Sequence, residues 1–258
     1  MGNVIDLHCH ILPGVDDGAQ TITDSIAMAK AAVAEGIHTI VATPHHQNGR
    51  YVNERTDILH QVKQLNALLK ENDINLTVLP GQEVRLYGDL LTDYEANKIV
   101  TLNETNTYIL IEFSSNHVPR YAEQMLYELR VKGLIPIIVH PERNAELIEH
   151  PDKLYNFVSK GALTQVTAGS LLGNFGKKIK KFSMQLIEHN LTHMIASDAH
   201  NTTTRGFHLQ AGYNVIEKEF GTSILMDFKE NPYLLINGKS VYKEDPEQIR
   251  RKKLFGIF

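Results

Sequence analysis

The chain has 258 residues, of which 42% are hydrophobic and 22% are charged, and its formal net charge is −4. This composition is typical of a soluble globular protein with a sizeable core, and the negative charge argues against a nucleic-acid-binding protein held by general positive charge. The single cysteine excludes an internal disulfide, which fits a reducing compartment. The first residues lack the pattern of a signal peptide, and no apolar stretch is long enough to span a membrane, so we expect a cytoplasmic protein.

Short apolar runs alternate with amphipathic helical stretches along most of the chain. The first predicted helix begins with a capping box formed by Thr21 and Asp24 and ends at Gly36. The predicted strands cover residues 4–8, 38–46, 75–84, 108–113, 135–140, 163–169 and 192–200. The predicted helices cover residues 21–36, 53–73, 88–98, 119–132, 145–160, 176–190 and 207–220.

The strands are nearly continuous apolar runs, which is typical of parallel strands that are buried on both faces. Seven strand–helix units favour an α/β fold with one (β/α)7 barrel over two separate domains. We therefore expect a single domain over residues 1–258, with a C-terminal tail from about residue 240. This tail is basic and then apolar, and we expect it to dock on the barrel.

Metal-ligand residue types stand at the ends of six of the seven predicted strands. They are His8, His10, His45, His46, Glu83, Glu112, His140, Asp198 and His200. The sixth strand, which ends in "TAGS", carries none. A single histidine or glutamate at a strand end is more often a hydrogen-bonding anchor than a ligand. In a parallel barrel, however, all carboxyl ends of the strands meet at one rim, where active sites lie.

The first strand carries His8 and His10 two residues apart, so both side chains should project from the same side. Without His46 and with Asp17 of the turn after the first strand, five histidines and four carboxylates on one rim would be costly to bury without cations. Imidazoles mixed with carboxylates suit manganese, iron or zinc better than calcium or magnesium. The number of candidates predicts two or three ions, with carboxylates such as Glu83 as bridges.

Seven short motifs occur along nearly the whole chain, namely "DLHCH", "DDG", "ATPHH", "GQEV", "LIEF", "HPER" and "ASDAHN". In order and spacing they resemble the motifs of the polymerase and histidinol phosphatase (PHP) superfamily. Within that superfamily, the chain is similar to the manganese-dependent bacterial tyrosine phosphatases of capsule and exopolysaccharide operons. The resemblance implies a distorted (β/α)7 barrel, that is, a PHP domain, with three metal ions at the rim.

The resemblance also implies a role for particular residues. It assigns one ion to His8, His10, Glu83 and Asp198, a second to Glu83, Glu112 and His140, and a third to Asp17, His45 and His200. It assigns phosphate binding to Arg143 and Arg205. Asp17 is the implied ligand of the "DDG" motif, and the role of Asp16 is left open. His46, His117 and Arg120 are weaker candidates for substrate contact.

The implied reaction is hydrolysis of phosphotyrosine, with a metal-bridging hydroxide as the nucleophile. The phenolate leaving group has a pKa of about 10, so a dedicated general acid is optional. The implied partner is the phosphotyrosine tail of a bacterial tyrosine kinase that regulates capsule and exopolysaccharide synthesis. The sequence does not indicate whether the protein is a monomer or an oligomer.

A cysteine nucleophile is a rival explanation of the first motif. Cysteine-dependent tyrosine phosphatases carry an arginine six residues after the cysteine, but Val15 occupies that position relative to Cys9. Because side chains alternate along a strand, Cys9 should face away from His8 and His10. We therefore expect Cys9 to be a small packed residue.

Three other functions remain open at this point. A metal-dependent amidohydrolase would also carry His-x-His on its first strand, but many such enzymes bridge two metals with a modified lysine, and Glu83 and Glu112 stand here instead. A histidinol-phosphate phosphatase would use the same metals on an alkyl phosphate. A non-catalytic metal-binding regulator could share the ligand set without turnover.

Overall fold

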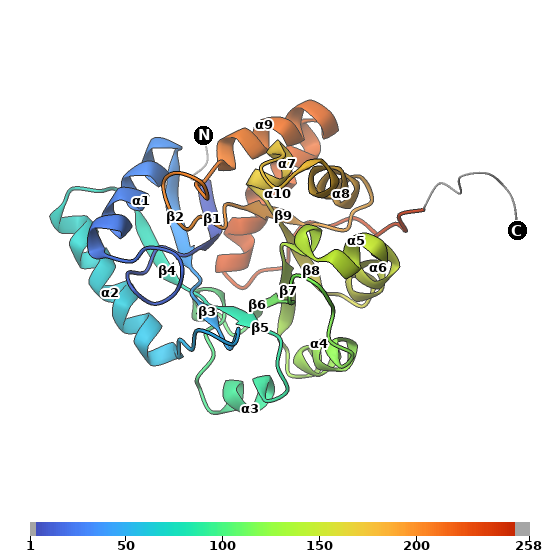
Figure 1. Cartoon of the computed structure of the whole chain (residues 1–258), viewed down its shortest axis with the longest axis horizontal. Coiled ribbons are helices and arrows are strands. Elements are labelled where there is room, and N and C mark those ends of the chain that lie inside the picture. The colour runs from blue at the N-terminus through green and yellow to red at the C-terminus, as the bar shows by residue number, and fades with distance from the viewer. Residues whose placement is uncertain (1–3, 251–258) are drawn as a thin grey trace, which may run out of the picture.

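Parallel strands run through the middle of the structure and helices lie around them (Figure 1). The computed structural model describes residues 4–250. The strands are β1 (Val4–Cys9), β2 (Ile37–Ala42), β3 (His45–His46), β4 (Thr77–Pro80), β5 (Glu83–Arg85), β6 (Tyr108–Glu112), β7 (Ile135–Val139), β8 (Leu163–Thr167) and β9 (Met194–Ala196). The α-helices are α1 (Ile22–Ala34), α2 (Arg55–Glu71), α3 (Leu90–Glu95), α4 (Ala122–Val131), α5 (Ala145–Glu149), α6 (Pro151–Ser159), α7 (Ala168–Leu172), α8 (Lys177–Glu188), α9 (Leu209–Phe220) and α10 (Thr222–Ile236). Two short 3-10 segments are η1 (Leu102–Glu104) and η2 (Pro141–Arg143).

The strands form two parallel sheets, in the orders β1-β2-β4 and β3-β5-β6-β7-β8-β9. The predicted parallel α/β architecture is confirmed, but two predicted strands were wrong in detail. The strand expected over residues 38–46 is divided into β2 and β3, and that over residues 75–84 into β4 and β5. Pro44, which has no N–H to donate to a sheet, lies in the first interruption. Gly81 lies in the second, where a Cβ would come within 2.6 Å of Val41 Cγ1.

The first strand, β1, and the last strand, β9, approach each other at their C-terminal ends. The N–H of Asp198 donates to the carbonyl of His8 at 2.9 Å, and the N–H of His10 donates to the carbonyl of Ala199 at 2.9 Å. The segment that follows β9 therefore runs beside the end of β1. This pairing fixes Asp198 and His200 next to His8 and His10.

Both faces of the strands are buried, as the apolar runs predicted. On β7, Ile137 and Val139 belong to an inner cluster between the strands, whereas Ile138 belongs to the larger cluster under the helices. Leu235 of α10 belongs to the inner cluster as well. Cys9 is fully buried in the larger cluster, and its burial raises the pKa of the thiol well above 9.0.

Two helical predictions need correction. The helix expected over residues 145–160 is two helices, α5 and α6, because Pro151 cannot continue the first of them. The helix α10 was not predicted. It contains Pro232, and proline is unfavourable inside a helix. Its Asn231 side chain donates to the carbonyls of His193 and Tyr242 at 2.8 and 2.9 Å, which anchors the helix.

The predicted C-terminal tail lies partly outside the described residues. Its described part docks on the rest of the chain. The N–H of Glu247 donates to the His189 carbonyl at 2.8 Å, and the Asn190 side chain donates to the Asp245 carbonyl at 3.0 Å. Over residues 4–250, the structure contains no helix with the length and apolar character that a membrane crossing requires.

Candidate metal centre

The nine side chains predicted to bind metal lie together beyond the ends of the strands. Four overlapping groups of them have ligand atoms within 4.8 Å of one another. The groups are His8, His10 and Asp198; His8, Glu83 and His140; His45, Glu83 and Glu112; and His10, Asp17, His45 and His200. Because each group shares a residue with another, the nine side chains form one continuous cluster that could hold metal ions. We refer to this candidate site as the metal centre.

Glu83 lies in the middle of the metal centre. Its register partner on β3 is His45, so the two strands present these side chains next to each other. Glu83 Oε2 lies 2.8 Å from His45 Nδ1 and 3.3 Å from the Nε2 atoms of His8 and His10. Its other oxygen, Oε1, lies 2.7 Å from His140 Nε2. A carboxylate shared among four imidazoles has the arrangement of a bridging ligand.

Hydrogen bonds behind the rings determine which nitrogen of His8 and His10 faces the centre. His10 Nδ1 donates to Asp16 Oδ2 at 2.6 Å, and His8 Nδ1 donates to Gln165 Oε1 at 2.9 Å. When such a ring is neutral, its Nε2 atom carries a lone pair. These two Nε2 atoms are 3.2 Å apart. Two such nitrogens at this distance need a proton or a cation between them, and a metal ion would satisfy both, so the donor set fits a metal ion.

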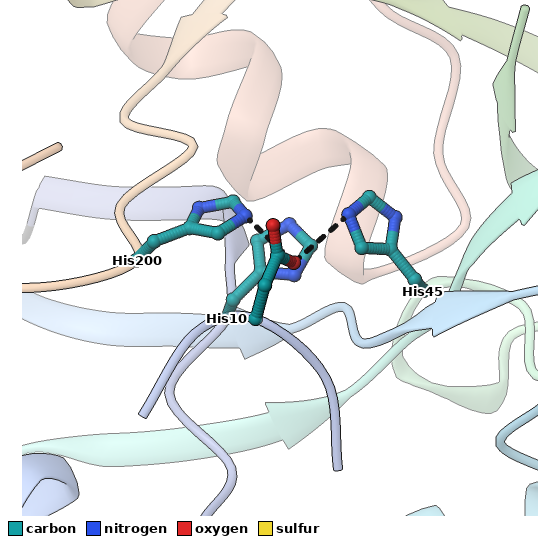
Figure 2. Close-up of side chains that lie close together, drawn as sticks. His10, His45 and His200 are labelled. Carbon is teal, nitrogen blue, oxygen red and sulfur yellow. Dashed lines mark ion pairs between the residues drawn. The ribbon is translucent and has the colours of Figure 1, made fainter. Parts of the chain in front are cut away.

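Figure 2 shows the rings of His10, His45 and His200 around a common space. The Asp17 carboxylate lies within this space, with Oδ1 3.4 Å from His45 Nε2 and 3.5 Å from His200 Nε2. His200 Nδ1 donates to a backbone carbonyl at 2.9 Å, which leaves its Nε2 buried and without a hydrogen bond among the described residues. A cation in this space would satisfy that nitrogen.

The charge states within the cluster are divided. Burial alone would lower the pKa of His10 and of His45, but the Asp16 carboxylate raises that of His10 well above 6.5 and Glu83 raises that of His45 to about 10, so a metal ion would displace a proton from these two rings.

Three other groups already have the form that binds metal. Burial lowers the pKa of His140 to about 4 and that of His200 to about 4, so both rings are neutral at pH 7. Burial alone would raise the pKa of Asp198, but the Arg143 guanidinium outweighs this effect and holds it well below 3.8. Neutral imidazoles and ionised carboxylates are the forms that coordinate metal.

Two of the predicted ligands have unusual backbone conformations. His140 has a φ of 36° and Asp198 has a φ of 52°, both in the left-handed region. Non-glycine residues adopt this region only where surrounding contacts hold them there, and such positions cluster at functional sites. The His140 N–H is held by the carbonyl of Gln165 at 2.7 Å.

A cavity of about 370 Å³ lies over the metal centre. It is lined by His45, Glu112, Phe113, Ser115, Val139, His140, Pro141, Arg143, Asn144, Phe175, Asp198 and Arg205. Asp198 Oδ2 accepts from Arg143 Nη2 at 2.7 Å and from Arg205 Nη2 at 3.1 Å, while its Oδ1 lies 3.5 and 3.4 Å from the Nε2 atoms of His8 and His10. Both arginines predicted to bind phosphate therefore border the metal centre.

Two residues that support the centre were not predicted. Asp16 is buried and holds His10, and it also accepts from the N–H groups of Gly18 and His45 at 2.9 and 3.1 Å. Gly18 is required here because a Cβ would lie 2.1 Å from the His10 carbonyl oxygen. Gln165 holds His8 from β8, the strand that ends without a ligand. Because Thr164 and Thr167 of the same strand are polar as well, the sequence offered no signal that distinguished Gln165.

The three weaker candidates lie outside the cavity over the metal centre. His46 alternates away from His45, is 1% exposed, and packs with its ring centroid 6.1 Å from that of Tyr87. His117 and Arg120 line a separate groove. The structure therefore places His46 as a packing residue, and the other two at a surface outside the cavity.

Comparisons with a protein family, with related sequences and with solved structures all agree with the resemblance seen in the sequence motifs. Residues 4–237 match the family described as "Capsular polysaccharide synthesis, CpsB/CapC". The chain is 52% identical to the tyrosine-protein phosphatase YwqE of Bacillus subtilis over 255 residues, which cover 99% of this chain and 100% of the relative. The chain also superposes with a TM-score of 0.93 on a solved structure. Its description covers YwqE from Bacillus subtilis and CpsB from Streptococcus pneumoniae, which are called metal-dependent tyrosine phosphatases. That match has 52% identity and covers 96% of this chain and 100% of the other.

More distant structures resemble the chain in fold alone. An organophosphorus hydrolase from Deinococcus radiodurans superposes with a TM-score of 0.57 at 14% identity, covering 90% of this chain and 92% of the other. The family match and the identity to YwqE are far more specific, and they agree with the motifs in the sequence. The chain therefore belongs to the CpsB/CapC family of capsular polysaccharide synthesis proteins.

Proposed function

We propose that the protein is a metal-dependent protein-tyrosine phosphatase. The observation that carries this proposal is the position of Asp198, whose carboxylate contacts His8 and His10 on one side and both Arg143 and Arg205 on the other. The side chains proposed to bind metal and the two arginines proposed to bind phosphate thus border a single cavity. The activity named for YwqE supports the same conclusion.

The nine side chains of the metal centre would hold two or three divalent ions. Manganese suits this mixture of imidazole and carboxylate ligands, with iron and zinc as alternatives. Bound divalent ions neutralise phosphate charge and generate a nucleophile from water near neutral pH. The fold proposed around them is a distorted (β/α)7 barrel, in which β2 and β3 form one wall segment, β4 and β5 another, and the segment after β9 pairs with β1.

The chain's own residues would orient the substrate. Arg143 and Arg205 can each offer forked N–H donors to phosphate oxygens, and both are fixed in place by Asp198. Asp16 and Gln165 keep His10 and His8 in the tautomer that directs Nε2 toward the centre. The Cys9 thiol takes no part, since it is buried on the opposite side of β1.

The substrate we propose is the phosphotyrosine tail of a bacterial tyrosine kinase, through which the enzyme would regulate capsular or exopolysaccharide synthesis. The family description supports this role. An extended, disordered tail can present one side chain at a time to a cavity at the end of the strands.

We expect the manganese-loaded protein to hydrolyse a phosphotyrosine peptide at least about tenfold faster, in kcat/KM, than the matched phosphoserine peptide. The reason is that phenolate is a much better leaving group than an alkoxide, and each 1.36 kcal/mol of barrier changes the rate about tenfold. The same assay should include histidinol phosphate and dihydroorotate. A wide preference for histidinol phosphate would reassign the enzyme within the PHP superfamily, and turnover of dihydroorotate alone would make it an amidohydrolase.

A further inference from the structure

Phe175 is an exposed aromatic residue at the cavity over the metal centre. It lies in the loop that joins α7 to α8 (Figure 1) and is 36% exposed. The other apolar residues of the cavity lining are much less accessible, with Phe113 at 4% and Val139 at 2%. Phe175 is therefore the most accessible apolar side chain in the lining of this cavity.

The position of the ring relative to the phosphate-binding groups is informative. The guanidinium carbon of Arg143 lies 5.3 Å from the centroid of the Phe175 ring, and the same guanidinium contacts Asp198 at 2.7 Å. A chain of contacts thus runs from Asp198 of the metal centre through Arg143 to Phe175. In phosphotyrosine, the aromatic ring is joined to phosphorus through a single oxygen. A phosphate held by Arg143 would therefore have its aromatic ring one oxygen away from phosphorus, and Phe175 is an aromatic residue of the lining that contacts the same guanidinium.

We propose that Phe175 forms the wall on which the aromatic ring of the substrate packs, and that it is a determinant of the preference for aryl over alkyl phosphates. The proposal rests on the phosphatase function proposed above. Two aromatic rings in an offset or edge-to-face arrangement attract each other beyond their buried area. An alkyl phosphate, such as phosphoserine, has no ring to make this contact, so Phe175 contributes nothing to its binding.

A different role for Phe175 would be to position Arg143 through the contact of its ring with the guanidinium. The two roles predict different patterns. Loss of a positioning residue would weaken every phosphate ligand, including inorganic phosphate, because Arg143 holds the phosphate itself. Loss of an aryl-binding wall would weaken only ligands that carry a ring.

The experiment compares wild type, Phe175→Ala, Phe175→Leu and Phe175→Tyr, each loaded with manganese. Three quantities are measured for each, namely kcat/KM for phenyl phosphate, kcat/KM for glycerol 2-phosphate, and the inhibition constant of inorganic phosphate. Tyr127→Ala is the matched control, because Tyr127 is a 62% exposed aromatic residue on α4 that does not line this cavity. Metal content is determined for every variant.

We expect Phe175→Ala to lower kcat/KM for phenyl phosphate by about three- to tenfold, the range of one aromatic pair. Its kcat/KM for glycerol 2-phosphate and its inhibition by inorganic phosphate should stay at the wild-type values. Phe175→Tyr should retain the aryl preference, Phe175→Leu should lose part of it, and Tyr127→Ala should match wild type. An equal loss for all three ligands, or an unchanged ratio of the two substrates, would overturn the proposal. Failure of the wild type to hydrolyse either substrate would instead overturn the proposed phosphatase function.

Discussion

Replacing His10 with alanine is expected to remove bound metal and to lower phosphatase activity by at least about a thousandfold. His10 belongs to two of the four ligand groups, and its Nε2 lies 3.3 Å from Glu83 and 3.4 Å from Asp198. Metal ions supply several kcal/mol of charge stabilisation in such reactions, and each 1.36 kcal/mol corresponds to about tenfold in rate. The measurements are elemental analysis of the purified variant and kcat/KM for a phosphotyrosine peptide.

His46→Ala is the matched control for this variant. His46 is as buried as His10, but it packs against Tyr87 and lies outside the four ligand groups. Its replacement should lower the thermal stability while metal content and activity persist. Circular dichroism should show both variants folded, because the rim contributes less to the core than the strands do. A His10→Ala protein that kept its metal and its activity would show that the ligand assignment is wrong.

Replacing Arg143 with alanine is expected to lower kcat/KM for phosphotyrosine peptides by about tenfold to a thousandfold, on the scale of one or two charge-assisted contacts. Loss of a contact that strengthens in the transition state lowers kcat, whereas loss of ground-state binding raises KM. Arg205→Ala should have a similar effect. Arg143→Lys should recover only part of the activity, because lysine keeps the charge but lacks the forked donors.

Arg120→Ala is the comparison for the arginine variants. Arg120 lies in the groove outside the cavity, and we expect its replacement to change kcat/KM by less than about threefold, the scale of an exposed charge. The metal content of all four variants should equal that of wild type. If Arg143→Ala and Arg205→Ala were both fully active, the phosphate would have to be held by the metal ions alone.

The sequence was sufficient to predict which nine side chains would lie together. Eight of them stand at the ends of apolar runs, and parallel strands bring such ends to one rim. The ninth, Asp17, was implied by the resemblance to the PHP superfamily, and the same strand-end pattern also included His46, which lies outside the cluster. The alternation along β1 also predicted that Cys9 would face away from His8 and His10. Both predictions depend only on the local periodicity of strands, which survives the details of packing.

Other features depend on contacts between distant parts of the chain. Asp16 and Gln165 acquire their roles only when the fold places them behind His10 and His8. The helix α10 continues through Pro232, and the neighbouring Asn231 donates to the carbonyls of His193 and Tyr242, which lie outside the helix. Phe175 stands in a loop without any motif, and only its position in the cavity suggests a function.

The divided strands had local signals that the apolar pattern concealed. Pro44 and Gly81 both stand inside predicted strands, and each is a residue that interrupts or bends a sheet. The interruptions have a functional consequence. They separate β3 and β5 from β2 and β4, and β3 and β5 are the segments that carry His45 and Glu83 into the metal centre.

The most direct test of the account is the activity of the wild-type protein after complete removal of metal by a chelator. We predict that two or three ions are lost per chain, that hydrolysis of a phosphotyrosine peptide stops, and that manganese restores it. Cys9→Ser should behave in the same way as wild type, since the buried thiol is not the nucleophile. A metal-free protein that retained full activity, or a Cys9→Ser variant that bound metal but was inactive, would contradict the metal-dependent mechanism.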